Sequence, residues 1–455
     1  MDVTDSPAEI PPPMELPEQV RLLEANARAL IEAGNHADAE RLFTQLLEVA
    51  PHHVPALQYL AGQALARNQL EVAQQLLERA IRIAPRRAEL HQNLGIVLQA
   101  RGYPQGALVA FDHALKYHPR LAVTWVQRGD VLQFLERHHD AIASYRQAEI
   151  LVGNLMRFAA LNPPRIQQII ERAAGFLHSE RLAILDTALA PLRRRHEPPA
   201  LEHAEQALAH MIHAAQPEYT DPLQQPAFGY FPGLEARPFY PRERFPRLSD
   251  LERKTPRIRA ELERVLTAPG ALKPYVEIAT GNAAQWTELN HSPKWSAYHL
   301  YWNGVPVPGH REECPDTIAA MDSLPLVRIP GHAPEIFFSI LAPQTHIPPH
   351  HGLANYKLAV HLPLVIPPHC AIRVGDETRE WAPGECLVFD DSFEHEAWNR
   401  GNTPRAVLIF EVWHPDLTPV ERKFLATAIA ALNQFNHQYA VAAAHEPNPG
   451  KPAQT

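Results

Sequence analysis

Histidines that could bind a metal gather in one stretch of this 455-residue chain. Between residues 345 and 414 there are seven of them: His346, His350, His351, His361, His369, His395 and His414. An imidazole nitrogen is a common ligand for zinc, copper, iron and nickel. A single histidine is more often a hydrogen-bonded side chain on the surface or in the core. The spacing must therefore decide which of the seven do chemistry.

Two of these histidines and one arginine follow an order that suits a non-haem iron site. His350 ends an early apolar stretch, His395 lies on a later one, and Arg405 follows ten residues after His395. Such a site needs neutral nitrogen ligands and open positions for a co-substrate and oxygen. A dicarboxylate co-substrate needs a cation deep in its pocket, and the arginine fork pairs with a carboxylate through two hydrogen bonds. These residue types favour an oxygenase.

Short β-strands are the elements that would position these residues. After about residue 218, short apolar runs alternate with prolines and glycines, and we expect strands at 337–341, 358–366, 371–374, 386–389 and 407–412. Runs of this length, bounded by turn residues, are typical of strands, and many short strands suggest a sandwich or barrel. The second half of the chain is therefore predicted to form a jelly roll.

The first third of the chain repeats every 34 residues. Small residues recur at Ala39, Ala73, Ala107 and Ala141, and large apolar residues recur four places later at Phe43, Leu77, Phe111 and Tyr145. Residues four apart share one helix face, and small residues let two helices approach closely. This period is typical of the tetratricopeptide repeat. Residues 19–154 are thus predicted to form four repeats in an all-α solenoid, which would bind a protein or peptide. A structural spacer or a dimerisation surface is the alternative.

The bulk composition narrows the class of protein. The net charge of −9 argues against binding a nucleic-acid backbone. The three cysteines contain no CxxC pair, which argues against a disulfide framework or a cysteine zinc site. The sequence shows no signal-peptide pattern and no apolar run of 18 residues, so we expect a cytoplasmic protein without a membrane segment.

Residues 228–422 resemble the aspartyl/asparaginyl β-hydroxylases, which are oxygenases dependent on iron(II) and 2-oxoglutarate. The resemblance rests on six motifs in the same order: residues 228–234 (FGYFPGL), 238–240 (PFY), 350–355 (HxGxxN), 361–364 (HLPL), 389–396 (FDDSFEHE) and 412–415 (VWHP). Bacterial members with tetratricopeptide repeats ahead of this domain are the most similar in organisation.

The resemblance implies a role for each candidate site residue. His350 and His395 would bind Fe(II), Arg405 and Ser339 would hold the distal carboxylate of 2-oxoglutarate, and His361 would contact the carboxylate nearest the metal. His350, His395 and Arg405 are thus the expected catalytic residues. The fold implied is a double-stranded β-helix (jelly-roll or cupin-like) after the solenoid. The reaction implied uses O2 to hydroxylate the β-carbon of an Asp or Asn residue in a peptide or protein, with the repeats recruiting substrate or partner.

Two positions depart from the pattern of related oxygenases. Gly352 stands where most of them have an acid that completes a facial triad; animal β-hydroxylases and iron halogenases also lack that acid, so this motif alone does not separate hydroxylation from halogenation. Ala359 replaces an arginine of the animal members, and Lys357 on the same strand face is the candidate substitute. Asp390 and Asp391 could be a carboxylate ligand, a base or a structural turn.

The remaining expectations concern organisation and alternative functions. We expect a disordered N-terminus over 1–18, a helical connector over 155–217, a catalytic domain over 218–436 and a disordered tail over 437–455. One alternative is a tailoring hydroxylase of a free or carrier-bound amino acid. Another is a non-catalytic scaffold or sensor, in which the repeats recruit a partner.

Overall fold

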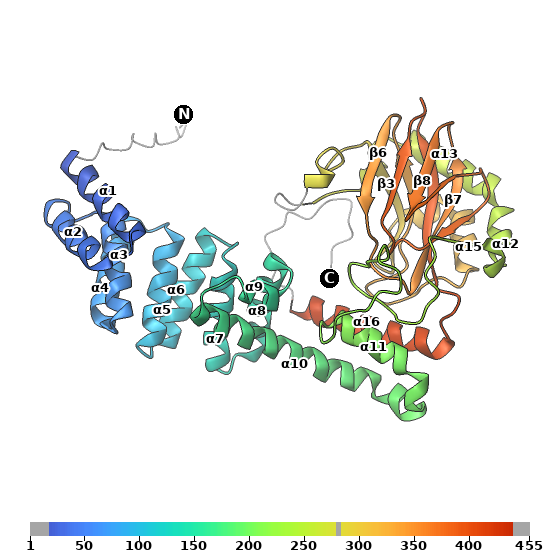
Figure 1. Ribbon diagram of the computed structural model, residues 1–455. Coiled ribbons are helices and arrows are strands. Elements are labelled where there is room, and N and C mark those ends of the chain that lie inside the picture. Colours follow the sequence, from blue (N-terminus) through green and yellow to red (C-terminus); the bar gives the residue numbers. More distant parts are fainter. Residues whose placement is uncertain (1–17, 279–283, 440–455) are drawn as a thin grey trace, which may run out of the picture. The chain divides into compact units, whose positions relative to one another are not determined.

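The computed structural model describes residues 18–278 and 284–439 (Figure 1). The segments expected to be disordered, 1–18 and 437–455, lie outside these residues except for Glu18 and residues 437–439. The chain divides into two compact units, and the division falls after Leu177. That position is inside helix α10 (Pro164–Arg195), within the segment expected to be a connector. Each unit is described by itself.

The first unit is a series of antiparallel helix pairs. Its helices are α1 (Glu18–Glu32), α2 (His36–Val49), α3 (Val54–Ala66), α4 (Leu70–Ile83), α5 (Ala88–Ala100), α6 (Pro104–Tyr117), α7 (Ala122–Phe134), α8 (His138–Val152) and α9 (Leu155–Ala159), followed by the start of α10. The first helices of successive pairs begin at Val54, Ala88 and Ala122, which keeps the 34-residue period. The helical-repeat fold predicted for this part of the chain is confirmed.

Small residues set the spacing of these helices. The four alanines of the repeat, Ala39, Ala73, Ala107 and Ala141, are completely buried. A Cβ added at Gly95 would lie 2.5 Å from Cε1 of Phe111, and one added at Gly129 would lie 2.5 Å from Cδ1 of Tyr145. The aromatic ring of the second helix thus occupies the space that glycine leaves on the first. Each pair also turns through a left-handed residue at the same place of the period: Gly34, Asn68, Gly102 and Glu136.

The second unit is built on two antiparallel sheets that face each other (Figure 1). The larger sheet has the order β1-β10-β7-β12-β5-β3-β2, with β4 paired to β3, and the smaller has the order β6-β11-β8-β9. The strands are β1 (Phe239–Tyr240), β2 (Lys273–Pro274), β3 (Trp295–Trp302), β4 (Val305–Pro306), β5 (Ile336–Leu341), β6 (Thr345–His350), β7 (Lys357–Val365), β8 (Cys370–Val374), β9 (Glu377–Glu380), β10 (Leu387–Phe389), β11 (His395–Asn399) and β12 (Arg405–Trp413).

Side chains alternate between the two faces of the large sheet. On β7, Leu358, Val360 and Leu362 belong to an outer core that helices α12 (Leu248–Glu252), α13 (Thr255–Thr267) and α15 (Pro315–Asp322) cover. Ala359 faces the small sheet and packs in an inner core with Ile347 and Ile372. The inner core between the sheets is therefore the place where the predicted site residues can meet, as expected for a double-stranded β-helix.

A third core lies beside the sheets. The second half of α10 and helices α11 (Glu202–Met211) and α16 (Pro419–Gln438) contribute Leu189, Leu208, Phe424 and Ile429 to it. Figure 1 shows α11 and α16 side by side. Residues 178–217, part of the expected connector, therefore pack as an integral part of the second unit. The unit's other short helices are α14 (His310–Glu313) and the 3-10 turns Pro198–Ala200, Arg242–Arg244 and Ala284–Trp286. Among the described residues, none of the helices is long and apolar enough to cross a membrane.

Candidate active site

All five predicted site residues line one cavity between the two sheets. This cavity has a volume of about 480 Å3 and contains His350, His395, Ser339, His361 and Arg405 in its wall. The small sheet supplies the two histidines, and the large sheet supplies the other three. The roles of these residues remain proposals, but the fold brings them together.

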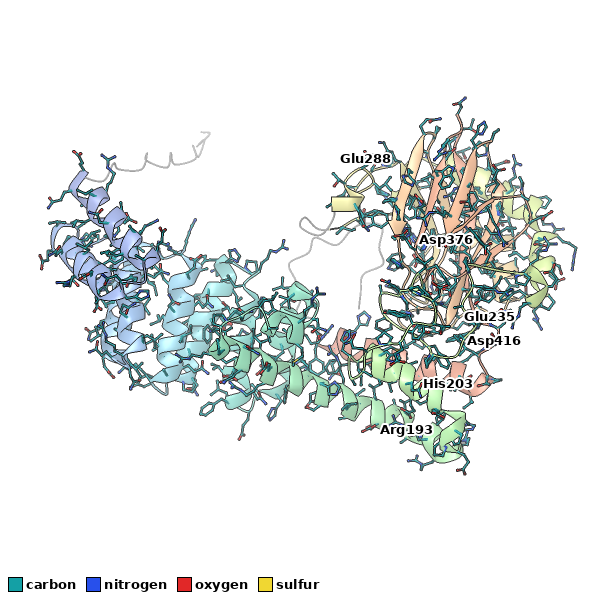
Figure 2. All side chains as sticks on the ribbon, in the orientation of Figure 1. Arg193, His203, Glu235, Glu288, Asp376 and Asp416 are labelled. Atoms are coloured by element: carbon teal, nitrogen blue, oxygen red, sulfur yellow. The ribbon has the colours of Figure 1, made fainter. Side chains whose placement is uncertain are left out.

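The other histidines of the cluster are distributed differently. His351 also lines the cavity, whereas the exposed His346 contacts Glu396 at 2.6 Å. His414 is buried outside the cavity, where its Nε2 lies 2.8 Å from the Tyr240 hydroxyl. It also contacts Glu235 and Asp416, which Figure 2 labels above His203 and Arg193.

His350 and His395 are neighbours on adjacent strands. The register of β6 and β11 places them opposite each other, with ring centroids 4.1 Å apart. Nδ1 of His350 donates to the Pro348 carbonyl at 2.8 Å, and Nδ1 of His395 donates to the Phe393 carbonyl at 3.0 Å. Because a carbonyl can only accept, each ring carries its proton on Nδ1 and keeps a lone pair on Nε2. Burial lowers the pKa of both histidines, that of His395 to about 3, so both rings are neutral. Neutral imidazole nitrogens with a free lone pair are common ligands of divalent metal ions, so this pair could bind one.

The position two residues after His350 offers no third ligand. Gly352 has no side chain, and a Cβ there would lie 2.6 Å from Oδ1 of Asp391 and even closer to its Cγ. Oδ1 of Asp391 is buried and has no hydrogen-bond partner among the described residues. Burial raises the pKa of Asp391 to about 7. Within the described part of the chain, no three His, Cys, Asp or Glu side chains are placed to hold a metal together. The donor set therefore fits iron held by two histidines, with further positions left for other ligands.

Arg405 is a buried cation at the other end of the cavity. It is 1% exposed, and its guanidinium lies 4.9 Å from the Trp381 ring. Its Nη1 donates to Ser339 Oγ at 3.5 Å, and its Nε has no partner. No carboxylate within the described ranges forms an ion pair with Arg405, and burial lowers its pKa to about 10. Because burying an unpaired charge is costly, this end of the cavity is suited to an anion.

His361 and Ser339 complete this end of the cavity. The Ser339 hydroxyl accepts a hydrogen bond from Trp295 Nε1 at 3.0 Å, which fixes its position. His361 is 6% exposed, and its ring lies against Trp381 and Phe389, with centroids 5.9 and 4.9 Å away. Its Nδ1 is buried without a hydrogen-bond partner in the described residues. Burial lowers the pKa of His361 well below its ordinary value. A neutral imidazole with an unused nitrogen can donate to, or accept from, a ligand.

Lys357 does not provide a free cation for the cavity. Its ammonium pairs with the Glu411 carboxylate, and Lys357 is only 5% exposed. Burial lowers the pKa of Lys357, but Glu411 and Asp391 raise it more, so the pKa lies above its ordinary value. Glu411 is six residues from Arg405 on β12, roughly 20 Å along the strand. Lys357 is therefore at the opposite end of the cavity from Arg405.

Several contributors were not identified from the sequence. Trp295 and Trp381 hold Ser339 and Arg405, and neither has a local motif that distinguishes it from a core residue. Glu411 has the same strand parity as Arg405, which is a signal that could have placed it on the cavity face. Asp390 accepts from Gln224 Nε2 at 2.7 Å and from the Ser392 amide at 2.9 Å, as in a structural turn, while Asp391 lines the cavity.

Known proteins match both units of the chain. The family model described as Aspartyl/Asparaginyl beta-hydroxylase matches residues 252–415, and tetratricopeptide-repeat models match residues 30–95 and 122–149. A MamA crystal structure aligns with 36% of this chain and 86% of its own, at 17% identity and a TM-score of 0.30, which is too weak a likeness to support an inference.

Three relatives illustrate the range of similar proteins. The ornithine lipid ester-linked acyl 2-hydroxylase of Rhizobium tropici is 35% identical over 201 residues, 44% of this chain and 67% of that protein. Aspartate beta-hydroxylase domain-containing protein 2 of Xenopus tropicalis is 30% identical over 217 residues, covering 46% and 55%. The human aspartyl/asparaginyl beta-hydroxylase is 38% identical over 138 residues, covering 30% and 18%. The match thus spans about half of the Xenopus protein and less than a fifth of the human one.

Since the hydroxylase model coincides with the sheet unit and the repeat models coincide with the helix pairs, the chain belongs to the aspartyl/asparaginyl β-hydroxylase family and carries tetratricopeptide repeats ahead of its hydroxylase domain.

Proposed function

We propose that this chain is an oxygenase that uses Fe(II), 2-oxoglutarate and O2 to hydroxylate an unactivated carbon. Membership of the family supports hydroxylation. The observation that carries the co-substrate is Arg405, a buried cation without a carboxylate partner among the described residues, in the same cavity as the histidine pair. The distal carboxylate of 2-oxoglutarate would supply the missing partner through the arginine fork.

The histidine pair provides the metal site of this proposal. His350 and His395 would hold iron through their Nε2 atoms, because both Nδ1 atoms are already bonded to backbone carbonyls. Bound iron would supply the oxidising chemistry, in which O2 and 2-oxoglutarate become succinate, CO2 and the hydroxyl oxygen inserted into a substrate C–H bond. The backbone bonds keep each ring oriented and in one tautomer, which is the usual role of partners behind metal-binding histidines.

The large sheet would orient the co-substrate. Arg405 and Ser339 bind one carboxylate, and Trp295 holds the Ser339 hydroxyl in place. His361 lies between Arg405 and the opposite end of the cavity, where its free nitrogen can bond the other carboxylate of 2-oxoglutarate. Trp381 packs on both Arg405 and His361 and excludes water from this end, which strengthens each charged contact.

The substrate is a separate part of the proposal. Hydroxylation of the β-carbon of an Asp or Asn residue in a peptide or protein stays a prediction. The repeats would be the surface that recruits this substrate or a partner. Hydroxylation of a lipid acyl chain is the second candidate, because a relative named for that reaction is 35% identical and is matched over 67% of its length. A non-catalytic scaffold is disfavoured, since a scaffold does not need Arg405, Ser339 and His361 in one cavity with two metal-competent histidines.

Co-substrate binding and turnover test this proposal separately. The purified full-length chain is loaded with Fe(II) without oxygen, and 2-oxoglutarate binding is measured by calorimetry. Succinate formation is then followed after oxygen is added. We expect one iron and one 2-oxoglutarate per chain. Failure to bind either iron or 2-oxoglutarate contradicts the proposal.

A further inference from the structure

The mouth of the cavity carries an excess of carboxylates. At the end away from Arg405, the described lining residues include Glu335 and Glu411, and Lys357 is the lysine there. Two carboxylates against one ammonium leave this region negative. Asp391 also lines the cavity but lies beside the histidine pair, away from the mouth.

The one ammonium of the mouth is already neutralised. Lys357 pairs with Glu411, and both side chains are largely buried in the cavity wall. The register of β7 and β12 places Ala359 opposite Glu411. Position 359 therefore presents only a methyl group beside this glutamate. A carboxylate entering the mouth would meet like charges and no free cation, which is unfavourable.

Aromatic rings line the same region. Tyr275 stacks on Phe337 with centroids 5.1 Å apart, and Trp286 lies edge-on to His350 at 5.1 Å. Trp286 is close in sequence to Glu288, which Figure 2 labels on the segment beside β6. Phe337 and Glu335 are two residues apart and both face the cavity, and Glu335 also contacts His299 at 3.2 Å. Aromatic faces attract cations, so rings and carboxylates here favour the same kind of ligand.

We propose that the substrate presents a cationic group, an ammonium or a guanidinium, to Glu335, Glu411 and the aromatic rings at the mouth of the cavity. The inference rests on the proposed function and specifies its substrate class. The carbon to be hydroxylated would lie toward the histidine pair, and the reaction is the same C–H hydroxylation. A basic residue of a peptide and a free basic amino acid share this chemistry, whereas an aspartate side chain has the wrong charge.

The test compares matched substrates on the iron-loaded full-length chain with 2-oxoglutarate bound. Four peptides differ only in a central Lys, Arg, Asn or Asp, and free lysine and ornithine form separate arms. Calorimetry without oxygen gives affinity, and mass spectrometry after oxygenation detects a product heavier by one oxygen atom. We expect a basic ligand to bind about tenfold or more tightly than the Asp peptide, as one unbalanced charge contact allows. Equal or tighter binding of the Asp peptide, or no binding of any cationic probe, overturns the inference.

The two proposals fail in different ways. If iron or 2-oxoglutarate does not bind, the oxygenase assignment is wrong. If both bind but the Asp peptide is preferred, only the substrate class is wrong.

Two variants test whether residues at the mouth of the cavity determine the preference for a cationic ligand. Glu335→Gln should weaken cation binding about fivefold or more and leave 2-oxoglutarate affinity unchanged, because Glu335 is remote from Arg405. Glu243→Gln, at an exposed position of the same unit, is the matched control. Ala359→Arg should reverse the order of the Asp and Lys peptides by adding the missing cation. Unchanged preference in both variants, with normal 2-oxoglutarate binding as proof of folding, overturns the inference.

Discussion

The carboxyl group of Asp391 occupies the space that a side chain at Gly352 would need. An ideal Cβ on Gly352 would lie 2.6 Å from Oδ1 of Asp391 and closer still to Cγ and Oδ2. The Gly352 amide also donates to the Asp391 carbonyl at 2.6 Å, so the two loops are held together by their backbones. The Asp391 carboxyl group, from the loop before β11, therefore lies where a side chain at position 352 would be. Glycine is needed here for space, and in the proposed site it also leaves a metal position open.

A methyl group at this position should damage the metal site. We expect Gly352→Ala to lower succinate formation about tenfold or more, because the Asp391 carboxyl must move toward the histidine pair or the loops must separate. The double variant Gly352→Ala/Asp391→Ala should recover iron binding, since it removes the clash. Gly175→Ala, with no atom near its Cβ, is the control. Wild-type activity of the single variant would show that the loops of Gly352 and Asp391 can move apart without loss of function, which contradicts the prediction.

Arg405 should bind co-substrate at the expense of stability. We expect Arg405→Met to weaken 2-oxoglutarate binding by about 100-fold, because a buried charge pair contributes roughly 2–5 kcal/mol. Without 2-oxoglutarate, the same variant should be more stable than wild type by roughly 1–3 kcal/mol, since it removes a buried cation without a carboxylate partner. Calorimetry and urea unfolding measure the two effects. A loss of stability without any loss of affinity would mean that Arg405 has a structural role only.

The histidine pair should determine metal binding. His350→Ala or His395→Ala should weaken iron binding about 100-fold and abolish succinate formation, because each removes one of the two nitrogen donors of the proposed site. His346→Ala is a matched control on the same strand, since its ring contacts Glu396 and does not line the cavity. Equal iron retention by the site variants and the control would place the metal elsewhere.

Much of the fold could be predicted because its signals are local. The apolar runs predicted as strands at 358–366 and 371–374 correspond to β7 and β8 within a residue or so. The strand ranges expected from the sequence leave out β6, which contains Pro348 and Pro349. β6 is an edge strand that pairs only with β11, and an edge accepts proline.

Contacts between distant segments could not be predicted in the same way. Strand parity places Lys357 on the cavity face, but its partner Glu411 depends on the register of β7 against β12. The direction of Asp391 depends on its contact with Gly352, which lies in another loop. The local sequence around Asp391 predicts a turn but not the direction of this side chain. Only the assembled sheets separate the carboxylate that faces the cavity from Asp390, which bonds within its turn.

The buried pair of Lys357 and Glu411 should be strongly coupled. Lys357→Met leaves a buried carboxylate without its partner and should lower the free energy of unfolding by roughly 3–5 kcal/mol. The double variant Lys357→Met/Glu411→Leu should recover most of that loss, because no uncompensated charge remains. Arg253→Met breaks an exposed pair with Asp250 and should cost less than about 1 kcal/mol. Urea unfolding of wild type, Lys357→Met, Glu411→Leu and the double variant gives the coupling energy; additive effects of the two pocket substitutions would contradict it.

Two helix glycines of the repeats should respond to alanine with opposite signs. Gly62 on α3 has no atom within 4 Å of its ideal Cβ, so Gly62→Ala should stabilise the chain by about 0.5–1 kcal/mol through helix propensity. Gly95 on α5 faces the Phe111 ring, which fills the position of a Cβ at 2.5 Å, so Gly95→Ala should destabilise it by about 1–3 kcal/mol. Gly95→Ala/Phe111→Leu should recover part of the loss, because leucine can withdraw from the contact. Thermal unfolding checks the signs, and 2-oxoglutarate binding should stay unchanged because these residues lie in the other unit. Stabilisation by both alanines would show that helix propensity, and not the ring contact, controls the spacing of the repeat helices.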